Sequence, residues 1–395
     1  MPIITKYSTL TPMRVCFFGT YTLDDGYPVN RTILKGLRAV GVEVEECHAR
    51  LWRQPRHRWS SRGWFLSPFF WVRTIGVYLK LILNYFKVGQ YDLMVVGYLG
   101  HQDLFLAKLL NLINRRPVVL IAFNSLYETV VQDRGLFSAR SLIGLFLRWV
   151  DRTTCLLADL VLLDTQAHIE YFVKEFDLPP SKFLRAFVGS DLTISPTLAP
   201  VRLGQEPKFE VLFVGTYIPL HGIETIIRAA KVLEAEPDIH FTLLGQGQLC
   251  EEMRGIARRL GLVNLRFIDR WVPAAELGGY MAAARVCLGV FGRAEKAQRV
   301  IPCKVFDCLA MAKPLITADT PAVRELLAHG ENALLCPAGD ELSLARAILQ
   351  LKKDPDLREK ISKNGHAIYL KSCEPDVIGR SLMQAFDRLM ESGKR

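Results

Sequence analysis

The sequence predicts two α/β domains, each built on a parallel sheet, that face each other across a cleft. The first observation is a repeated phrase, because Val15–Tyr21 reads VCFFGTY and Val211–Tyr217 reads VLFVGTY. In both copies an apolar run ends at Gly, as expected for a buried parallel strand that leaves its sheet through a tight turn. The second observation is length, since 395 residues are long for one core and suit two. The third is a β-α-β alternation along the chain.

Residues 1–190 contain the elements of the first domain. The run Arg14–Gly19 predicts its first strand, and a helical pattern near Val29–Val40 ends at Gly41. Alternation over Val42–Glu46 predicts a second strand. Later apolar runs and helical patterns continue the series, with strands at Asp92–Val96, Val118–Phe123 and Leu160–Asp164 and helices at Leu104–Asn111 and 138–157.

A linker over 191–207, marked by three prolines and few large apolar residues, separates the two domains. The second domain, 208–375, alternates cleanly. Its strands are expected at Val211–Gly215, Phe241–Gly245, Leu265–Ile268, Val286–Val290, Leu315–Ala318 and Ala333–Cys336. Its helices are expected near Ile223–Glu234, Glu251–Leu260, Ala275–Ala284, Pro302–Met311, Ala322–Leu327, Glu341–Lys352 and 356–370. The end of the chain, 376–395, predicts a last helix that crosses back to the first domain.

Composition limits the classes of function. The formal net charge of +10 favours anionic partners. Nine cysteines without a C-x-x-C pair indicate reduced thiols in a cytoplasmic protein and no metal site. The first residues lack the pattern of a signal peptide. The longest apolar stretch, Val72–Phe86, is interrupted by Arg73, Lys80 and Asn84, so no membrane span is expected.

Residues 48–91 form an unusual insert. They hold four of the six tryptophans, eight Arg or Lys residues, and no Asp or Glu. Basic residues interleaved with Trp, Phe and Leu are typical of a segment that lies on an anionic membrane surface. The same composition suits nucleic acid, which binds by charge and stacking. A third interpretation is a set of helices packed on the first domain, with arginines reaching to solvent. We favour the membrane and consider nucleic acid the weaker candidate.

The strongest candidate for chemistry is the basic stretch 292–307. A strand ends at Gly292, a basic loop follows, and Pro302 stands where a helix begins. A helix N-terminus attracts anions, and Lys296, Arg299 and Lys304 add positive charge there. The arrangement suits a diphosphate, with Asp307 placed to accept hydrogen bonds from ribose hydroxyls. The plain alternative is a solvated loop with ordinary charges.

Four blocks of the second domain carry a family resemblance. They are Phe213–Gly215, the turn Leu244–Gly247, the helix and strand Lys304–Ile316, and Asn332–Asp340. Their order and spacing resemble the donor-binding half of glycosyltransferase family 4, and Leu156–Thr165 resembles a strand of that family's first domain. The resemblance implies the GT-B architecture, with two Rossmann-like domains facing across a cleft.

Departures from the family pattern indicate a divergent branch. Thr216 and His221 stand where the family often has Arg and Lys on the donor diphosphate. Of the family's two glutamates, the first position is Arg299 and the second is Asp307. Phe123 occupies the place of a frequent histidine. In this interpretation Lys296, Arg299 and Lys304 replace the missing phosphate-binding bases.

The remaining site candidates have weaker signals. The resemblance implies that the turn at Gly245 and the backbone of Val272 approach the donor. It also implies that the loop with Thr20 and Gly26 approaches the phosphates and the acceptor. Asn124 and Asp133 follow the end of a strand, where ligands gather in open α/β sheets. They are the candidates for catalysis, with Asp133 orienting an acceptor hydroxyl, although a structural pair of Asp133 with Arg134 is a close alternative.

The resemblance implies a retaining glycosyltransferase that moves a sugar from a nucleotide-diphosphate sugar to an acceptor hydroxyl, without metal or other cofactor. The second domain would bind the donor and the first the acceptor. Synthesis of polysaccharide, glycolipid or another cell-envelope glycan is expected. A lipid-linked acceptor would place the protein in the cytoplasm, peripheral on the inner face of the plasma membrane. Two alternatives are a sugar-nucleotide epimerase of the same architecture, against which Phe123 counts, and a non-catalytic sugar-nucleotide-binding protein.

Overall fold

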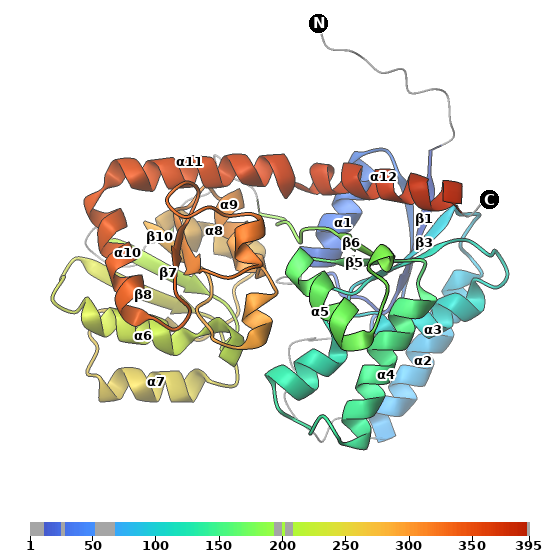
Figure 1. The fold of residues 1–395 in the computed structure, drawn as a ribbon, viewed down its shortest axis with the longest axis horizontal. Helices are drawn as coiled ribbons and strands as arrows, with labels where there is room; N and C mark the ends of the chain where they lie inside the picture. Colours follow the sequence, from blue (N-terminus) through green and yellow to red (C-terminus); the bar gives the residue numbers. More distant parts are fainter. Residues whose placement is uncertain (1–11, 25–27, 52–67, 193–199, 202–207, 393–395) are drawn as a thin grey trace, which may run out of the picture.

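The computed structural model describes residues 12–24, 28–51, 68–192, 200–201 and 208–392. Two lobes lie side by side, each with a sheet in its centre and helices on both faces (Figure 1). Two long helices run along one edge of the molecule and connect the lobes. We call the lobe of the first sheet the N-terminal lobe and that of the second sheet the C-terminal lobe.

The N-terminal lobe contains a six-stranded parallel sheet of order β2-β1-β3-β4-β5-β6. Its strands are β1 (Arg14–Gly19), β2 (Glu43–His48), β3 (Leu93–Val96), β4 (Val118–Ile121), β5 (Leu160–Leu163) and β6 (Phe183–Arg185). The helices between them are α1 (Pro28–Ala39), α2 (Pro68–Tyr85), α3 (His101–Leu110), α4 (Leu142–Leu157) and α5 (Gln166–Phe176). A short π-helical turn, η3 (Glu128–Asp133), follows β4.

The C-terminal lobe repeats the architecture, with a six-stranded parallel sheet of order β12-β11-β10-β7-β8-β9. Its strands are β7 (Phe209–Val214), β8 (Ile239–Leu244), β9 (Leu265–Ile268), β10 (Val286–Leu288), β11 (Leu315–Ala318) and β12 (Leu334–Cys336). Its helices are α6 (Ile223–Val232), α7 (Cys250–Arg259), α8 (Ala274–Ala283), α9 (Cys303–Ala310), α10 (Glu341–Lys353) and α11 (Pro355–Ser372). The prediction of two parallel α/β sheets is confirmed.

Continuous apolar strands explain why both sheets lie inside the protein. Every residue of β3, β4, β8 and β11 is buried, as expected where helices cover both faces of a parallel sheet. One apolar core runs through both lobes, and the rings of Phe187 and Phe306 lie 6.1 Å apart where the lobes meet. The lobes are therefore joined by packing as well as by the chain.

The last helix, α12 (Pro375–Ser392), packs on α1 of the N-terminal lobe. Two glycines allow this close approach. A Cβ added at Gly36 would lie 2.1 Å from the carbonyl oxygen of Pro375, and one at Gly379 would lie 2.1 Å from that of Gly36. Because neither position has room for a side chain, the two helix backbones are in contact.

Several elements differ from the sequence predictions. Residues 322–327 contain only the 3-10 turn η7 (Val323–Glu325) instead of a helix. Helix α5 and strand β6 were not predicted. Residues 48–91 include the last residue of β2 and the whole of α2, so part of this range belongs to the fold of the N-terminal lobe. Trp52, Trp59 and Trp64 lie outside the described residues. Most of the predicted linker 191–207 also lies outside them.

Candidate functional site

The repeated phrase places two equivalent turns at the carboxyl ends of β1 and β7. In each sheet the order of strands reverses beside this strand, β1 against β3 and β7 against β10, which is where open α/β sheets bind ligands. Gly19 ends β1 and Gly215 directly follows β7, with φ of +134° and +158°. A Cβ added at Gly19 would meet Asp103 Oδ2 at 2.8 Å, and one at Gly215 would meet Lys304 Nζ at 2.6 Å. The two turns therefore face buried side chains of opposite charge.

In the N-terminal lobe the space beside this turn is filled by the side chain of Asp103. The Asp103 carboxylate accepts hydrogen bonds from Thr20 N at 2.6 Å and from Tyr78 Oη at 2.6 Å. The Thr20 hydroxyl also donates to it, at 2.9 Å. A negative, fully bonded group under this turn does not suit a phosphate. Thr20, predicted to approach the phosphates, instead bonds to Asp103, and Gly26 lies outside the described residues.

In the C-terminal lobe the corresponding group is a cation without a partner. Lys304 lies in the first turn of α9 and is buried, and among the described residues its Nζ has no hydrogen-bond partner. The Nζ atom lies 4.2 Å from the centre of the Phe213 ring. Burial lowers the pKa of Lys304 to about 7. A buried ammonium group is costly unless it meets an anion, so this position points to an anionic ligand.

His221 lies beside Lys304, under the same turn. Its Nδ1–H donates a hydrogen bond to the carbonyl oxygen of Thr216, with a nitrogen–oxygen distance of 2.5 Å. Burial lowers the pKa of His221 well below its ordinary value, and the nearby Lys304 acts in the same direction. The ring is therefore neutral. Lys304, His221 and Thr216, three of the predicted donor residues, lie together at the end of β7. Gly245, a fourth, lies against the backbone of Gly215, because a Cβ there would lie 1.9 Å from Gly215 O.

Lys296 and Arg299 contact the N-terminal lobe. Lys296 Nζ donates to Asn124 Oδ1 at 2.6 Å and to Thr129 Oγ1 at 2.8 Å, both in the N-terminal lobe. Arg299 donates to Glu128 Oε1 at 2.8 Å, and its guanidinium carbon lies 4.1 Å from the centre of the Tyr171 ring. These two cations bind the lobes to each other. Their contact with a donor diphosphate stays a prediction, and in this structure N-terminal acceptors hold both side chains.

The contacts of Lys296 and Arg299 with the N-terminal lobe form a polar seam between the lobes. Glu128 lies at its centre and is not among the residues predicted from the sequence. It lies in the π-helical turn η3 and is fully buried. Burial alone would raise its pKa, but His168, Lys296 and Arg299 lower it to about 2. His168 in turn bonds to Asp164 at 2.7 Å, and although burial opposes it, the two acids raise the pKa of His168 to about 9. The sequence does distinguish this residue in one way, because Glu128 is the only acidic residue between 104 and 132.

Asp307 bonds to the segment that connects the two lobes. Its carboxyl accepts a hydrogen bond from the hydroxyl of Ser190 at 2.5 Å. Ser190 is at the end of the N-terminal lobe, and its carbonyl accepts a bond from Tyr369 Oη on α11 at 3.0 Å. Burial raises the pKa of Asp307 to about 7. The residue therefore joins the segment that connects the lobes to α9, and its role at ribose stays a prediction.

A cavity of about 230 Å³ lies between the lobes. Phe123, Asn124 and Asp133 line it from the N-terminal lobe, and Lys296 and Pro302 from the C-terminal lobe. Burial raises the pKa of Asp133, whose buried Oδ1 has no hydrogen-bond partner among the described residues. The side-chain oxygen of Asn124 accepts the hydrogen bond from Lys296 described above. The side chain of Val272 is buried in the core.

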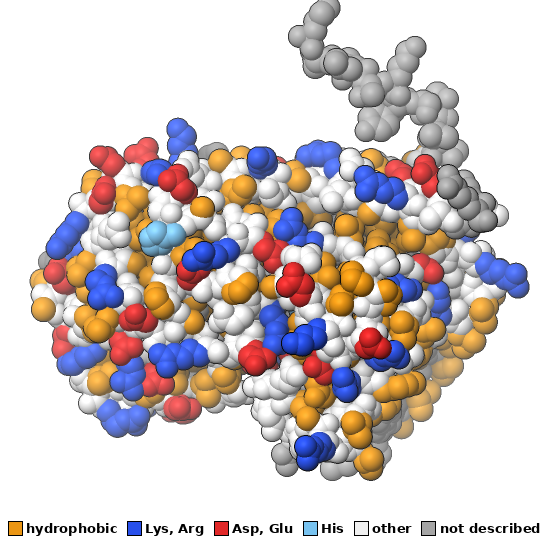
Figure 2. All heavy atoms as spheres, in the orientation of Figure 1, with side chains coloured by type: hydrophobic (Ala, Val, Ile, Leu, Met, Phe, Trp, Pro, Cys, Tyr) orange, Lys and Arg blue, Asp and Glu red, His pale blue; other side chains and the backbone are white. Residues whose placement is uncertain are grey.

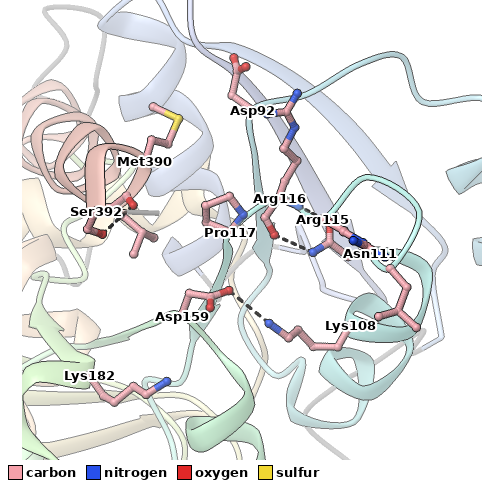
Figure 3. Close-up of a pocket in the computed structure, with 12 residues that line it drawn as sticks. Asp92, Lys108, Asn111, Arg115, Arg116, Pro117, Asp159, Lys182, Met390 and Ser392 are labelled. Atoms are coloured by element: carbon pink, nitrogen blue, oxygen red, sulfur yellow. Dashed lines mark hydrogen bonds and ion pairs between the residues drawn. The ribbon is translucent and has the colours of Figure 1, made fainter. Parts of the chain in front are cut away.

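A larger pocket, of about 640 Å³, lies far from these turns, at the amino ends of β3, β4 and β5 beside the end of α12 (Figure 3). Lys108 points to Asp159, with Nζ 3.2 Å from its Oδ2, and Lys182 donates to the carbonyls of Leu156 and Ala158. Because these cations already have partners, size alone does not make this pocket the functional site.

Two further features of the described ranges bear on cofactors and location. Within them, no group of three or more His, Cys, Asp or Glu side chains is arranged to hold a metal ion. None of the helices that the structure describes is long and apolar enough to cross a membrane.

Comparisons with known proteins agree with this geometry. Residues 208–354 match the family described as Glycosyl transferases group 1. A phosphatidyl-myo-inositol mannosyltransferase of Mycobacterium leprae is 28% identical over 208 residues, 52% of each chain. The lipopolysaccharide core biosynthesis glycosyltransferase LpsD of Rhizobium meliloti is 25% identical over 46% of this chain and 50% of that protein. The chain thus spans about half the length of the curated relatives it matches.

Solved structures resemble the chain over nearly its whole length. Anabaena Alr3699/HepE, solved with UDP-glucose, has a TM-score of 0.65 and 18% identity over 95% of this chain and all of that one. A sucrose-phosphate synthase of Thermosynechococcus elongatus has a TM-score of 0.69 and 16% identity over 96% of this chain. At these identities the likeness concerns the fold, which is GT-B.

Proposed function

We propose, from the glycosyl transferases group 1 domain at residues 208–354, that this chain is a glycosyltransferase of glycan biosynthesis. It would move a sugar from a nucleotide-diphosphate sugar to an acceptor hydroxyl. The observation that carries the proposal is Lys304, a buried cation at the switch point of the C-terminal sheet that has no hydrogen-bond partner among the described residues. Donor binding in relatives adds support, because HepE was solved with UDP-glucose.

The donor diphosphate would lie against the turn at Gly215 and the N-terminus of α9. Free N–H groups and the helix dipole favour negative charge there, and Lys304 adds a full charge in a site with little water. A diphosphate oxygen beside the ammonium would offset its burial and raise its pKa again. As the bond to the sugar breaks, charge grows on this diphosphate, so the same groups stabilise the transition state more than the ground state.

Retention of configuration is part of the proposal. In that mechanism the leaving phosphate helps to remove the proton from the acceptor hydroxyl, so no nucleophile of the protein is needed. Asp133 is our candidate for orienting that hydroxyl, because it lines the interlobe cavity and no described residue bonds to its Oδ1. Asn124 would act indirectly, by holding Lys296.

The acceptor is proposed to be a lipid-linked or envelope glycan, handled at the inner face of the plasma membrane without a cofactor. The names of the relatives support this class, because one is a phosphatidyl-myo-inositol mannosyltransferase and another acts in lipopolysaccharide core biosynthesis.

Calorimetric titration with UDP, GDP and ADP tests the donor site. Lys304→Met keeps the length of the side chain but removes its charge. We expect it to weaken binding of the preferred nucleoside diphosphate by about 1.5–3 kcal/mol, the range for charged hydrogen bonds. Lys360→Met is the matched control, because Lys360 is a surface lysine of α11 paired with Glu331. Equal affinity of Lys304→Met and the wild type would refute the assignment.

A further inference from the structure

The exposed apolar side chains of this protein are concentrated in one place. Among the described residues, only Val232, Val263, Leu342 and Leu370 are exposed large hydrophobic side chains outside the region of α2, α3 and α4. All others lie on these three helices or directly after them. Figure 2 shows hydrophobic side chains gathered on the lower right of the N-terminal lobe, over α3 and α4. Such a patch marks an interaction surface.

Helix α2 is apolar on two faces. Val77, Leu81 and Tyr85 pack into the core. The opposite face carries side chains at the spacing of one helical stripe, each of them 56–68% exposed: Val72, Ile75, Leu79, Leu83 and, just after the helix, Phe86. A surface helix normally turns polar residues outward. Burial in the fold therefore explains only the inner face of α2.

The stripe continues onto the neighbouring helices. Tyr78 and Tyr85 of α2 donate hydrogen bonds to Asp103 and to the carbonyl of Leu110, so α2 lies against α3. Phe105 of α3 stacks on Trp149 of α4 at 6.0 Å. The outer side of α4 and the end of α3 add further exposed apolar side chains: Leu109, Leu112, Ile113, Leu142, Ile143, Leu145, Phe146 and Trp149.

The charges of α2 and of the turn after it have one sign, whereas three basic side chains of α3 and α4 pair with acids. Helix α2 contains no acid, and neither do residues 104–127 or 134–150. Arg73, Lys80, Lys87 and Arg140 have no acidic partner within the described part of the chain. An apolar stripe flanked by uncompensated cations is the pattern of a segment that rests on anionic head groups. Two copies of this surface facing each other would bring like charges together, which disfavours self-association.

We propose that the outer faces of α2, α3 and α4, the docking surface, bind the N-terminal lobe to an anionic lipid bilayer. The apolar side chains enter the boundary of the acyl chains, and the basic side chains contact the head groups. This inference deepens the proposed function, because it names the membrane partner of the lobe expected to hold the acceptor. The inference depends on the proposed function only where it concerns the acceptor. Binding to lipid does not depend on that function.

Vesicle flotation tests the docking surface on the full chain. Vesicles of phosphatidylcholine, alone or mixed with phosphatidylglycerol, would be compared at low and high salt. The wild type should bind the anionic vesicles, and salt should weaken the binding. Lys80→Glu with Lys87→Glu, or Leu79→Gln with Leu83→Gln, should each reduce binding by roughly tenfold or more.

The C-terminal half of the protein supplies matched controls. Val263→Gln with Leu342→Gln changes exposed apolar residues, and Lys363→Glu with Lys371→Glu changes exposed lysines of α11. Neither pair should alter vesicle binding. Circular dichroism would verify folding of every variant, and calorimetry should find unchanged nucleotide binding.

The outcomes separate the two proposals. A wild type that binds nucleotide but no anionic vesicles overturns the docking surface and leaves the proposed function standing. Loss of vesicle binding in the control pairs also overturns it. Dimers in ultracentrifugation that the α2 variants dissolve would assign the surface to a second copy instead. Vesicle binding without any nucleotide binding would support the surface and contradict the proposed function.

Discussion

At the scale of single residues, the two lobes use one turn for opposite purposes. Asp103 and Lys304 each lie under the glycine of the repeated phrase. Asp103 is satisfied by Thr20 and Tyr78, so it fixes the turn of the N-terminal lobe. Lys304 has no such partner among the described residues, so its charge is available to a ligand. The side chain beside the glycine, Asp103 in one lobe and Lys304 in the other, therefore distinguishes a structural turn from a candidate binding site.

The seam at Glu128 predicts a pH dependence of stability. The pKa of His168 is about 9 in the fold against 6.5 for an ordinary histidine, since Asp164 and Glu128 outweigh its burial. The folded state therefore holds the proton more tightly. The stabilisation is complete below pH 6.5 and is lost as pH rises through 9. The free energy of unfolding in urea should fall over this range, and His168→Gln should flatten the profile. A wild-type profile identical to that of His168→Gln would contradict the assignment.

At the scale of elements, the central strands were predictable because they are continuous apolar runs. Arg14–Gly19 matches β1 to the residue, and the predicted strand at Leu265–Ile268 matches β9. Strand β6 is a half-exposed edge of three residues, too short for a periodic signal. Helix α5 does carry a periodic signal, with Ile169, Phe172 and Phe176 buried on one face behind the cap of Thr165, so it was predictable as well.

The candidate site was predictable where local sequence decides position. Lys304 and His221 follow strands whose ends meet at one edge of the sheet. The partners of Lys296, Arg299 and Asp307 could not be predicted, because Asn124, Glu128 and Ser190 belong to the other side of the interlobe boundary. Such pairings depend on how two lobes meet, and local sequence patterns do not report that arrangement.

The contact of α1 with α12 makes a prediction at this scale. Gly36→Ala places a Cβ 2.1 Å from the carbonyl oxygen of Pro375, so the helices must move apart. We expect a loss of about 1–3 kcal/mol in the free energy of unfolding, as for other overpacked sites. Gly76→Ala in α2 is the control, because nothing lies within 4 Å of the added Cβ, and helix propensity should make it stabilising by about 0.5–1 kcal/mol. Urea unfolding measures both. Equal effects of the two variants would show that α12 does not pack on α1.

At the scale of the whole molecule, two lobes built on six-stranded parallel sheets of different strand order are joined in three ways. The core continues from Phe187 to Phe306, the seam pairs Arg299 with Glu128, and α12 returns to α1. The candidate donor turn lies in the C-terminal lobe, and Asp133 lines the interlobe cavity from the N-terminal lobe. The docking surface lies on the outer side of that same N-terminal lobe. The whole arrangement suits a donor from solution and an acceptor from a membrane.

Release of nucleoside diphosphate from sugar nucleotides tests the central claim most directly. Purified protein would be incubated with UDP-, GDP- and ADP-sugars, with and without a bacterial lipid extract, and products followed by mass spectrometry. Release that requires the extract, with the sugar recovered on a lipid and activity lost in Lys304→Met but not in Lys360→Met, is the predicted result. A new sugar nucleotide formed without acceptor would indicate an epimerase. Binding of sugar nucleotides without any turnover would indicate a non-catalytic protein. Either outcome would contradict the account.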